Sequence, residues 1–146
     1  MGIARGLLSC RRTIRRGATA VEFAFVVPVM VAIVLACVDL GRFAYNYIAV
    51  TNAARAGAAY GIMNPYSSSS LTTWTAAVKQ AAKDEMAQQP GYDSTKLNVT
   101  VTTATETNGL RRVRVSASYP FQTVVNWPGI PNQLTLDGVV EMRSIR

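Results

Sequence analysis

The sequence predicts an α+β protein in which a long N-terminal transmembrane helix extends into a small exported domain. In that domain, one further helix packs on a three-stranded antiparallel sheet. Three observations lead to this fold class. Every residue from Phe23 to Val38 is apolar. One later segment repeats apolar residues with helical spacing, and the last third of the chain holds three segments in which apolar and polar residues alternate.

The N-terminal segment, residues 1–17, carries five arginines and no acidic residue. The net charge of the chain is +7, so most of it lies in this segment, which argues against a nucleic-acid partner. Arginines directly before an apolar segment are typical of the cytoplasmic flank of a membrane span. We interpret residues 1–17 as a basic cytoplasmic leader. Its charge anchor is expected to be Arg11, Arg12, Arg15 and Arg16.

Residues 18–38 are predicted to form a single transmembrane helix of the inner (plasma) membrane. As an α-helix these residues extend about 31 Å, which matches the ~30 Å hydrocarbon core of a bilayer. Pro28 is tolerable because neighbouring helices can satisfy the carbonyl that it frees. The arginines keep the N-terminus cytoplasmic, so the C-terminal domain is expected to be periplasmic or extracellular.

Two other kinds of N-terminal segment have to be weighed against a transmembrane helix. A secretory signal peptide has a shorter apolar region, followed by a small-residue cleavage site. A lipoprotein signal is the closer rival, because Val34-Leu35-Ala36-Cys37 loosely resembles a lipidation motif, although Leu35 fits it poorly. An uncleaved anchor and a lipoprotein lipidated at Cys37 therefore stay as alternatives.

Glu22 is the carboxylate at the cytoplasmic edge of the apolar run. An ionisable group inside a bilayer costs on the order of 2.5 kcal/mol or more near the helix centre, and less near the interface. Glu22 is therefore a candidate functional residue. The alternative is an interfacial carboxylate that interacts with the positive end of the helix dipole and has no partner.

Helical spacing continues after the apolar run, and we expect residues 39–62 to extend the same helix outside the membrane. The sequence has no strong helix breaker before Gly61 and Pro65. Small residues recur at every fourth position of this extension and allow another helix or backbone to approach closely. This packing stripe consists of Ala49, Ala53, Gly57 and Gly61. It can face either the chain's own domain or another subunit.

Residues 63–146 are predicted to form the exported domain, which begins with a polar loop at 64–70. A helix is expected at 71–89, with Ser70 or a neighbour as its N-cap and Pro90-Gly91 at its end. Its predicted apolar face consists of Trp74, Val78, Ala81, Ala82 and Met86.

Strands are predicted at about 97–102, 112–119 and 134–142, where apolar and polar residues alternate. Asn108-Gly109 indicates a hairpin between the first two strands. We interpret Arg111, Arg112 and Arg114 as part of a solvated strand face and turn. Since one face of the sheet is polar, the other needs a cover, which the second helix and the end of the long helix can provide.

The composition gives little support to catalysis. The chain has no histidine. Its two cysteines cannot pair, because Cys10 lies in the basic segment and Cys37 at the far end of the apolar run, so they are expected on opposite sides of the bilayer. No nucleophile elbow, phosphate loop or metal-ligand spacing is present in the sequence. We therefore predict no enzymatic activity, catalytic residue, metal, cofactor or small-molecule substrate.

The N-terminal part of the chain resembles the TadE-like pseudopilins. The resemblance covers roughly residues 15–61, less than a third of the chain. It is carried by Gly17-Ala18-Thr19-Ala20-Val21-Glu22-Phe23, the apolar run with Pro28, Asp39-Leu40-Gly41-Arg42, and Asn52-Ala53-Ala54-Arg55. The family-motif positions on the helix beyond the apolar run are Asp39, Gly41, Arg42, Asn52 and Arg55.

The resemblance implies a pilin-like lollipop fold and a role as a minor structural subunit of a tight-adherence (Tad, type IVc) pilus. It implies cleavage between Gly17 and Ala18 by a prepilin peptidase, with Glu22 and Phe23 as recognition and assembly residues. Expected partners are that peptidase, other pilins or pseudopilins, and inner-membrane platform proteins. The alternative function is an uncleaved, membrane-anchored scaffold or binding domain of a secretion apparatus.

Cleavage after Gly17 would create an α-amino group on Ala18, four residues before Glu22. Two ions attract strongly in hydrocarbon, and each is costly when unpaired. The Ala18 ammonium of one subunit is therefore expected to pair with Glu22 of a neighbour and so favour one axial register.

Overall fold

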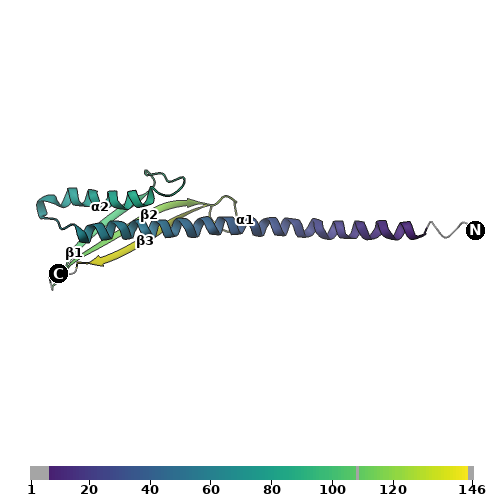
Figure 1. The fold of residues 1–146 in the computed structure, drawn as a ribbon, viewed down its shortest axis with the longest axis horizontal. Coiled ribbons are helices and arrows are strands. Elements are labelled where there is room, and N and C mark those ends of the chain that lie inside the picture. The colour runs from purple at the N-terminus through teal and green to yellow at the C-terminus, as the bar shows by residue number, and fades with distance from the viewer. Residues whose placement is uncertain (1–6, 108, 145–146) are drawn as a thin grey trace, which may run out of the picture. The chain divides into compact units, whose positions relative to one another are not determined.

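The computed structural model describes residues 7–107 and 109–144, and it describes side chains from residue 17 onward within these ranges. Its elements confirm the α+β fold class (Figure 1). They are, in chain order, α1 (Leu7–Met63), the short 3-10 helix η1 (Ser68–Ser70), α2 (Leu71–Met86), β1 (Asn98–Thr105), β2 (Arg111–Gln122) and β3 (Gln133–Arg143). The chain divides into two compact units, and the boundary between them lies between Leu40 and Gly41.

Helix α1 begins at Leu7, well before the predicted start at residue 18. Residues 7–16 contain neither proline nor glycine, and leucine and arginine are good helix formers. Gly17 costs about 1 kcal/mol relative to alanine inside a helix, which does not stop a helix with favourable residues on both sides. The basic leader is therefore continuous in backbone conformation with the apolar run.

The C-terminal end of α1 lies at Met63, one residue beyond the predicted extension. The side chain and backbone amide of Asn64 both donate to the carbonyl of Tyr60, at 3.0 Å each. Pro65 cannot continue the helix because it has no N–H to donate. Gly61 lies within the helix and is closely packed, since a Cβ on Gly61 would lie 3.0 Å from Val113 Cγ1.

Helix α2 ends at Met86, three residues before the predicted end. Its buried residues are Trp74, Val78, Ala82 and Met86, whereas Ala81, also predicted on this face, is only half-buried. Ser70 occupies the N-cap position, but its side chain makes no cap hydrogen bond to α2. The Ser70 hydroxyl instead accepts the backbone N–H of Ser67 at 3.0 Å, so the serine run is tied together by its own hydrogen bonds.

The three strands form one antiparallel sheet in the order β1-β2-β3. Val115 of the central strand is opposite Val101 of β1 and Val140 of β3. The predicted hairpin between β1 and β2 is present, and Gly109 has a positive φ of 79°. Its predicted partner in the turn, Asn108, lies outside the described residues.

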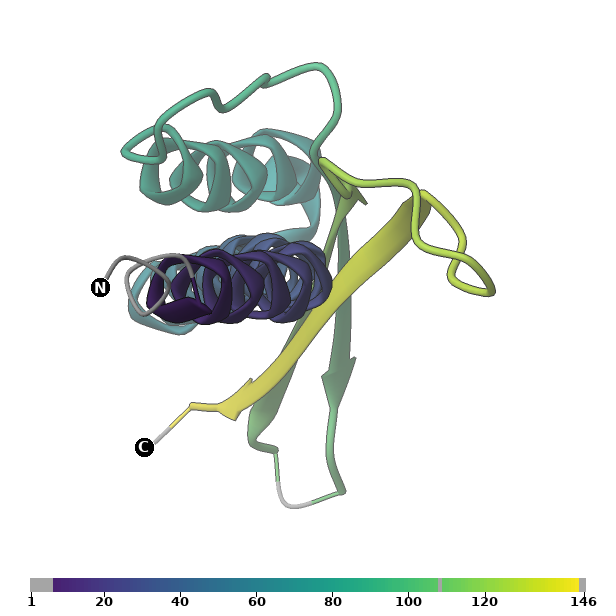
Figure 2. The ribbon, with the colours of Figure 1, turned by 90° about the vertical axis from the view of Figure 1, so that its right-hand side faces the viewer.

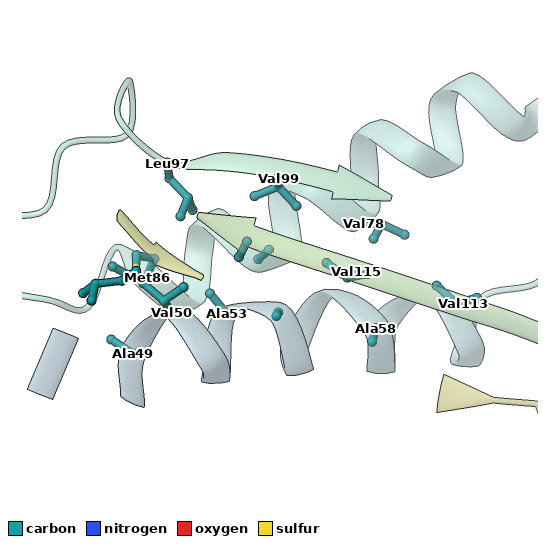
Figure 3. Packing of buried hydrophobic residues seen from close by; sticks show 14 of the residues in the cluster. Ala49, Val50, Ala53, Ala58, Val78, Met86, Leu97, Val99, Val113 and Val115 are labelled. Carbon is teal, nitrogen blue, oxygen red and sulfur yellow. The ribbon is translucent and has the colours of Figure 1, made fainter. Parts of the chain in front are cut away.

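The core lies between one face of the sheet and two helices, α2 and the part of α1 beyond Gly41. Figure 2 shows both helices on the same side of the sheet, and Figure 3 shows the side chains between them. The fully buried members include Val50, Val78, Met86, Val113 and Val115. The predicted cover of the sheet is therefore confirmed.

Strand β3 passes very close to the backbone of α1 at Gly138. A Cβ at this position would lie 3.0 Å from the carbonyl oxygen of Val50 and 3.0 Å from the Cα of Thr51. Only glycine lets a strand approach a helix backbone at this distance. This contact lies inside the unit that begins at Gly41.

Candidate membrane and assembly site

The first part of α1 exposes large apolar side chains along residues 17–38. Among the residues that the structure describes, one helix is long and apolar enough to cross a membrane. Its most apolar window has a mean hydropathy of 2.7, and none of that window is buried. Phe23 and Phe25 are 68% and 75% exposed. An apolar surface of this size is normally covered by lipid or by another protein.

Gly17, Ala18, Glu22 and Phe23 all lie on α1 and are exposed. Ala18 and Glu22 are four residues apart in the helix, so they lie on the same helix face, one turn from each other. Gly17 has open space where a Cβ would be. Glu22 is the charged residue of the 17–38 segment, and all its neighbours in sequence are uncharged. The side chains of Arg11, Arg12, Arg15 and Arg16 lie outside the described residues.

The predicted motif pair Asp39 and Arg42 marks the end of the apolar segment. Asp39 is 6% exposed, a rare degree of burial for a carboxylate, and both Asp39 and Arg42 have interaction partners. The Arg42 guanidinium lies 5.5 Å from the centre of the Phe121 ring. Cation–π contacts of this kind contribute about 0.5–1 kcal/mol at exposed sites. Gly41 is exposed and has open space around it.

Asn52 and Arg55 form a local pair one helical turn apart. An Arg55 Nη atom donates a hydrogen bond of 3.1 Å to the side-chain oxygen of Asn52. Ala53 and Ala54, which lie between them, are fully buried. This part of the motif therefore has a buried side, which packs in the domain core, and an exposed polar side.

The packing stripe lies against the chain's own domain. Ala49 and Ala53 belong to the core, and Gly57 and Gly61 are buried. A Cβ on Gly57 would lie 3.2 Å from the Val78 carbonyl oxygen, 3.3 Å from the Ala82 Cβ and 3.4 Å from Val115 Cγ1. Of the two alternatives for the stripe, the structure therefore shows contact with α2 and β2 of the same chain.

Some contacts within the domain could not be predicted from the sequence. Phe121 packs edge-on against Phe43, with ring centres 5.6 Å apart. At the other end of the sheet, the Arg111 guanidinium lies 4.1 Å from the centre of the Tyr66 ring and donates to the Tyr66 carbonyl at 3.3 Å. Arg111 is thus half-buried and stacked on Tyr66, whereas the alternating pattern of the strand predicted a solvated side chain.

The other two arginines that were predicted to lie on a solvated strand face, Arg112 and Arg114, differ from each other in their contacts. Arg112 forms ion pairs with Glu106 at 2.8 Å and with Glu141 at 3.2 Å. Arg114 is exposed on the outer face of the sheet. In the part of the chain that the structure describes, no group of three or more histidine, cysteine, aspartate or glutamate residues could hold a metal ion.

The fold and the exposed apolar helix define a class of protein: a small α+β domain carried on a long N-terminal helix that has the features of a membrane anchor. Within this class, residues 17–59 match the model of the TadE-like protein family, which confirms the resemblance seen in the motifs. The match indicates a protein related to the Tad pilus. No curated protein and no solved structure matches the chain.

Proposed function

We propose that this chain is a minor pilin-like structural subunit for the biogenesis of a Tad (type IVc) pilus. The observation that carries the proposal is a wholly exposed apolar helix face with one carboxylate, Glu22, inside the segment that matches the TadE-like family. The domain beyond it has its own core, so the exposed helix is free to serve as an assembly element.

In this proposal the chain has four functional segments. Residues 1–17 are a cytoplasmic leader, which a prepilin peptidase removes at the Gly17–Ala18 bond. Residues 18–38 span the inner membrane, and residues 39–62 continue the helix on the other side. Residues 63–146 form the exported domain, on the periplasmic or extracellular side. The leader arginines set this orientation before they are removed.

Assembly depends on the charge created by cleavage. The new ammonium group on Ala18 is the nearest available cation for a Glu22 carboxylate of an adjacent subunit in hydrocarbon. Removing one member of such a pair leaves the other as an uncompensated charge. The pairing therefore favours the axial register that brings both groups together. Partners in this register are other pilins or pseudopilins, held by inner-membrane platform proteins.

The second candidate function is an uncleaved membrane-anchored scaffold or binding domain of a secretion apparatus. It is favoured by one observation, the continuity of α1 from Leu7 through Gly17, because a continuous helix spans the proposed cleavage site. A lipoprotein lipidated at Cys37, which is exposed, is the third possibility.

The decisive experiment is the intact mass of the protein extracted from native membranes. The proposal expects a chain that begins at Ala18. A chain that retains residues 1–17 supports the scaffold, and a chain that begins at Cys37 with added lipid supports the lipoprotein; either outcome contradicts the proposal. A Gly17→Val variant is the matched control, because the larger residue at the cleavage site should leave the full-length mass.

Recovery of the protein in sheared pilus material then tests entry into the filament. A subunit that is processed and found in sheared filaments is incorporated. A subunit that is processed but stays in the membrane fraction acts in priming or assembly only.

A further inference from the structure

The loop between β2 and β3, residues 123–132, is an ordered structure. Its two ends are joined by a hydrogen bond from the Thr123 N–H to the Asn132 carbonyl, 3.1 Å long. At its tip, the Ile130 N–H donates to the Trp127 carbonyl at 3.2 Å. Pro128 and Gly129 are the central residues of this turn, and Gly129 has a φ of 84°. Proline followed by a glycine with positive φ is typical of a type II turn. The loop therefore presents its side chains in a defined arrangement.

The β2–β3 loop is apolar, uncharged and exposed. Val124 is 65% exposed and Ile130 is 52% exposed, while Trp127 is half-buried. The sequence has no aspartate, glutamate, lysine or arginine between Arg114 and Asp137. Loops at a water-exposed surface are normally polar. A loop with these residues is suited to an interface between an apolar phase and water.

The strand that leads into the loop packs on the part of α1 that follows the apolar run. Phe121, two residues before the loop, contacts Phe43 and Arg42 of α1. Arg42 and Phe43 follow Val38, the last residue of the apolar run, by four and five positions, which is about 6–8 Å along a helix. The loop therefore follows a strand end that packs on those residues of the domain that are closest to the apolar run in sequence. In Figure 2 the loop, in yellow-green, projects from the end of the sheet.

Exposed aromatic residues also occur on α1 after the apolar run. Tyr45 and Tyr47 are 53% and 49% exposed and follow Val38 by seven and nine positions. Tyrosine and tryptophan are enriched where a membrane protein crosses the level of the lipid headgroups. Tyr45, Tyr47 and Trp127 thus give the domain aromatic residues of the interfacial type on two different elements, α1 and the β2–β3 loop.

We propose that the β2–β3 loop docks into the interfacial layer of the same bilayer that holds the N-terminal helix. The occupant of this apolar surface is lipid, because the strand that leads into the loop packs through Phe121 on Phe43, five residues after the apolar run, and because the loop has no charged side chain for pairing with a protein. The domain then has two attachments to the membrane, its helix and its loop, and this fixes which side of the sheet faces outward. The inference depends on membrane anchoring and is independent of leader cleavage.

The two tryptophans of the chain provide a direct test. Trp127 lies in the loop, and Trp74 packs with Tyr66 and Gly61 near the other end of the domain. Gly61 is 18 residues after Phe43, or about 27 Å along α1. The full-length protein is reconstituted in phosphatidylcholine vesicles with either brominated or ordinary acyl chains, and flotation with the vesicles checks insertion. Bromine quenches tryptophan fluorescence only at short range.

The Trp74→Phe variant, in which Trp127 is the remaining tryptophan, should lose about half or more of its fluorescence in brominated vesicles. The Trp127→Phe variant should be unaffected. Equal fluorescence of Trp127 in both kinds of vesicle would overturn the proposal. Far-UV circular dichroism will show whether Trp74→Phe folds. If it does not, the difference in fluorescence between the wild-type protein and Trp127→Phe gives the quenching of Trp127.

A second pair of variants separates lipid docking from contact with another copy of the chain. Ile130→Asp should abolish the quenching of Trp127, whereas Val139→Asp should leave it unchanged. Val139 is the matched control because it is 49% exposed but lies on a strand, opposite Ser116. Quenching that persists in Ile130→Asp contradicts lipid docking. Shielding of Trp127 from water that appears only at a high ratio of protein to lipid also contradicts lipid docking, because it would indicate contact with a second copy of the chain. Failure of this test leaves the pilus proposal intact, and an uncleaved leader leaves this test intact.

Discussion

The two parts of helix α1 use apolar residues in opposite ways. From residue 17 to residue 38 the side chains are large and exposed, among them Phe23 and Phe25. From residue 49 to residue 61 the inward-facing residues are mainly small, and Ala53, Ala54 and Ala58 are fully buried. The backbone conformation is the same in both parts. The difference lies in what covers the side chains.

This comparison shows how far each part depends on other molecules. The small residues of the second part let α2 and the sheet approach closely, and the chain itself supplies that cover. Burial of apolar surface contributes about 25 cal/mol per Å². The first part has a similar need for cover and none from the chain inside its own unit, so lipid or other subunits have to provide it. Stability should therefore depend on the second part and assembly on the first.

Enlarging a glycine in the second part should have the largest effect on stability. Gly61→Leu inserts a side chain where a Cβ already lies 3.0 Å from Val113 Cγ1 and 3.1 Å from Trp74 Cζ2. We expect a loss of about 3 kcal/mol in the free energy of unfolding, because overpacking a filled core forces side chains and backbone to move. Thermal unfolding of the full chain in detergent micelles measures this loss.

The matched variant is Gly41→Leu, on the same helix but with open space around the glycine. It should change the stability by less than about 1 kcal/mol, in the stabilising direction, since leucine is a better helix former than glycine. Equal destabilisation by the two variants would contradict the contrast between the parts of α1.

Glu22→Ala should separate assembly from folding. The variant should insert and keep the melting temperature of the domain, because Glu22 is exposed and belongs to a different compact unit from the domain core. Incorporation of the variant with wild-type subunits, measured by pull-down from membranes, should fall by about tenfold, which is about 1.4 kcal/mol.

Glu22→Gln keeps the size and polarity of the side chain and removes the charge, so it should fail in the same way. Glu22→Asp keeps the charge and should assemble better than either. If Glu22→Gln assembles like the wild type, the charge has no role in assembly.

Arg111→Ala tests a contact that only the second unit contains. It removes the cation–π contact with Tyr66 and one hydrogen bond to the Tyr66 carbonyl, and we expect a loss of about 1 kcal/mol. Chemical denaturation of the full chain measures this loss. Arg114→Ala is the exposed control from the same strand and should change the stability very little. A similar loss of stability in both variants would mean that stacking on Tyr66 adds nothing to the free energy of unfolding.

Arg55→Ala should have the smallest effect. It breaks the hydrogen bond between Arg55 and Asn52 on the exposed side of α1, and pairs of this spacing contribute about 0.2–0.5 kcal/mol. Thermal unfolding should therefore differ only slightly from the wild type. A large loss of pilus incorporation without a loss of stability would instead assign this motif pair to contact with a partner.

Several elements could be predicted from local sequence because their signals are short-range. The alternation of Val99 and Val101 with threonines predicted β1, and the spacing of Trp74, Val78, Ala82 and Met86 predicted the buried face of α2. Helix ends were less accurate. Helix α1 begins at Leu7, eleven residues before the start of the predicted membrane span, because the leader residues are themselves good helix formers.

The candidate site could be predicted in its residues but not in its contacts. The motif from Gly17 to Phe23 is visible in sequence because an isolated carboxylate beside an apolar run is unusual wherever it occurs. The contact between Phe121 and Phe43 joins residues far apart in the chain, and neither residue has a pattern that points to the other. The same applies to Arg111 and Tyr66.

The sequence alone determined the types of element, their order, the apolar run and the charge at its edge. These features depend on residues within a few positions of each other, so periodicity and composition reveal them. Only the tertiary structure decided that the stripe from Ala49 to Gly61 faces the chain's own sheet and helix. It also decided that Arg111 stacks on Tyr66 and that the strand leading into an uncharged loop packs through Phe121 on Phe43. Each of these facts depends on which distant segments meet, and that is set by packing of the whole core.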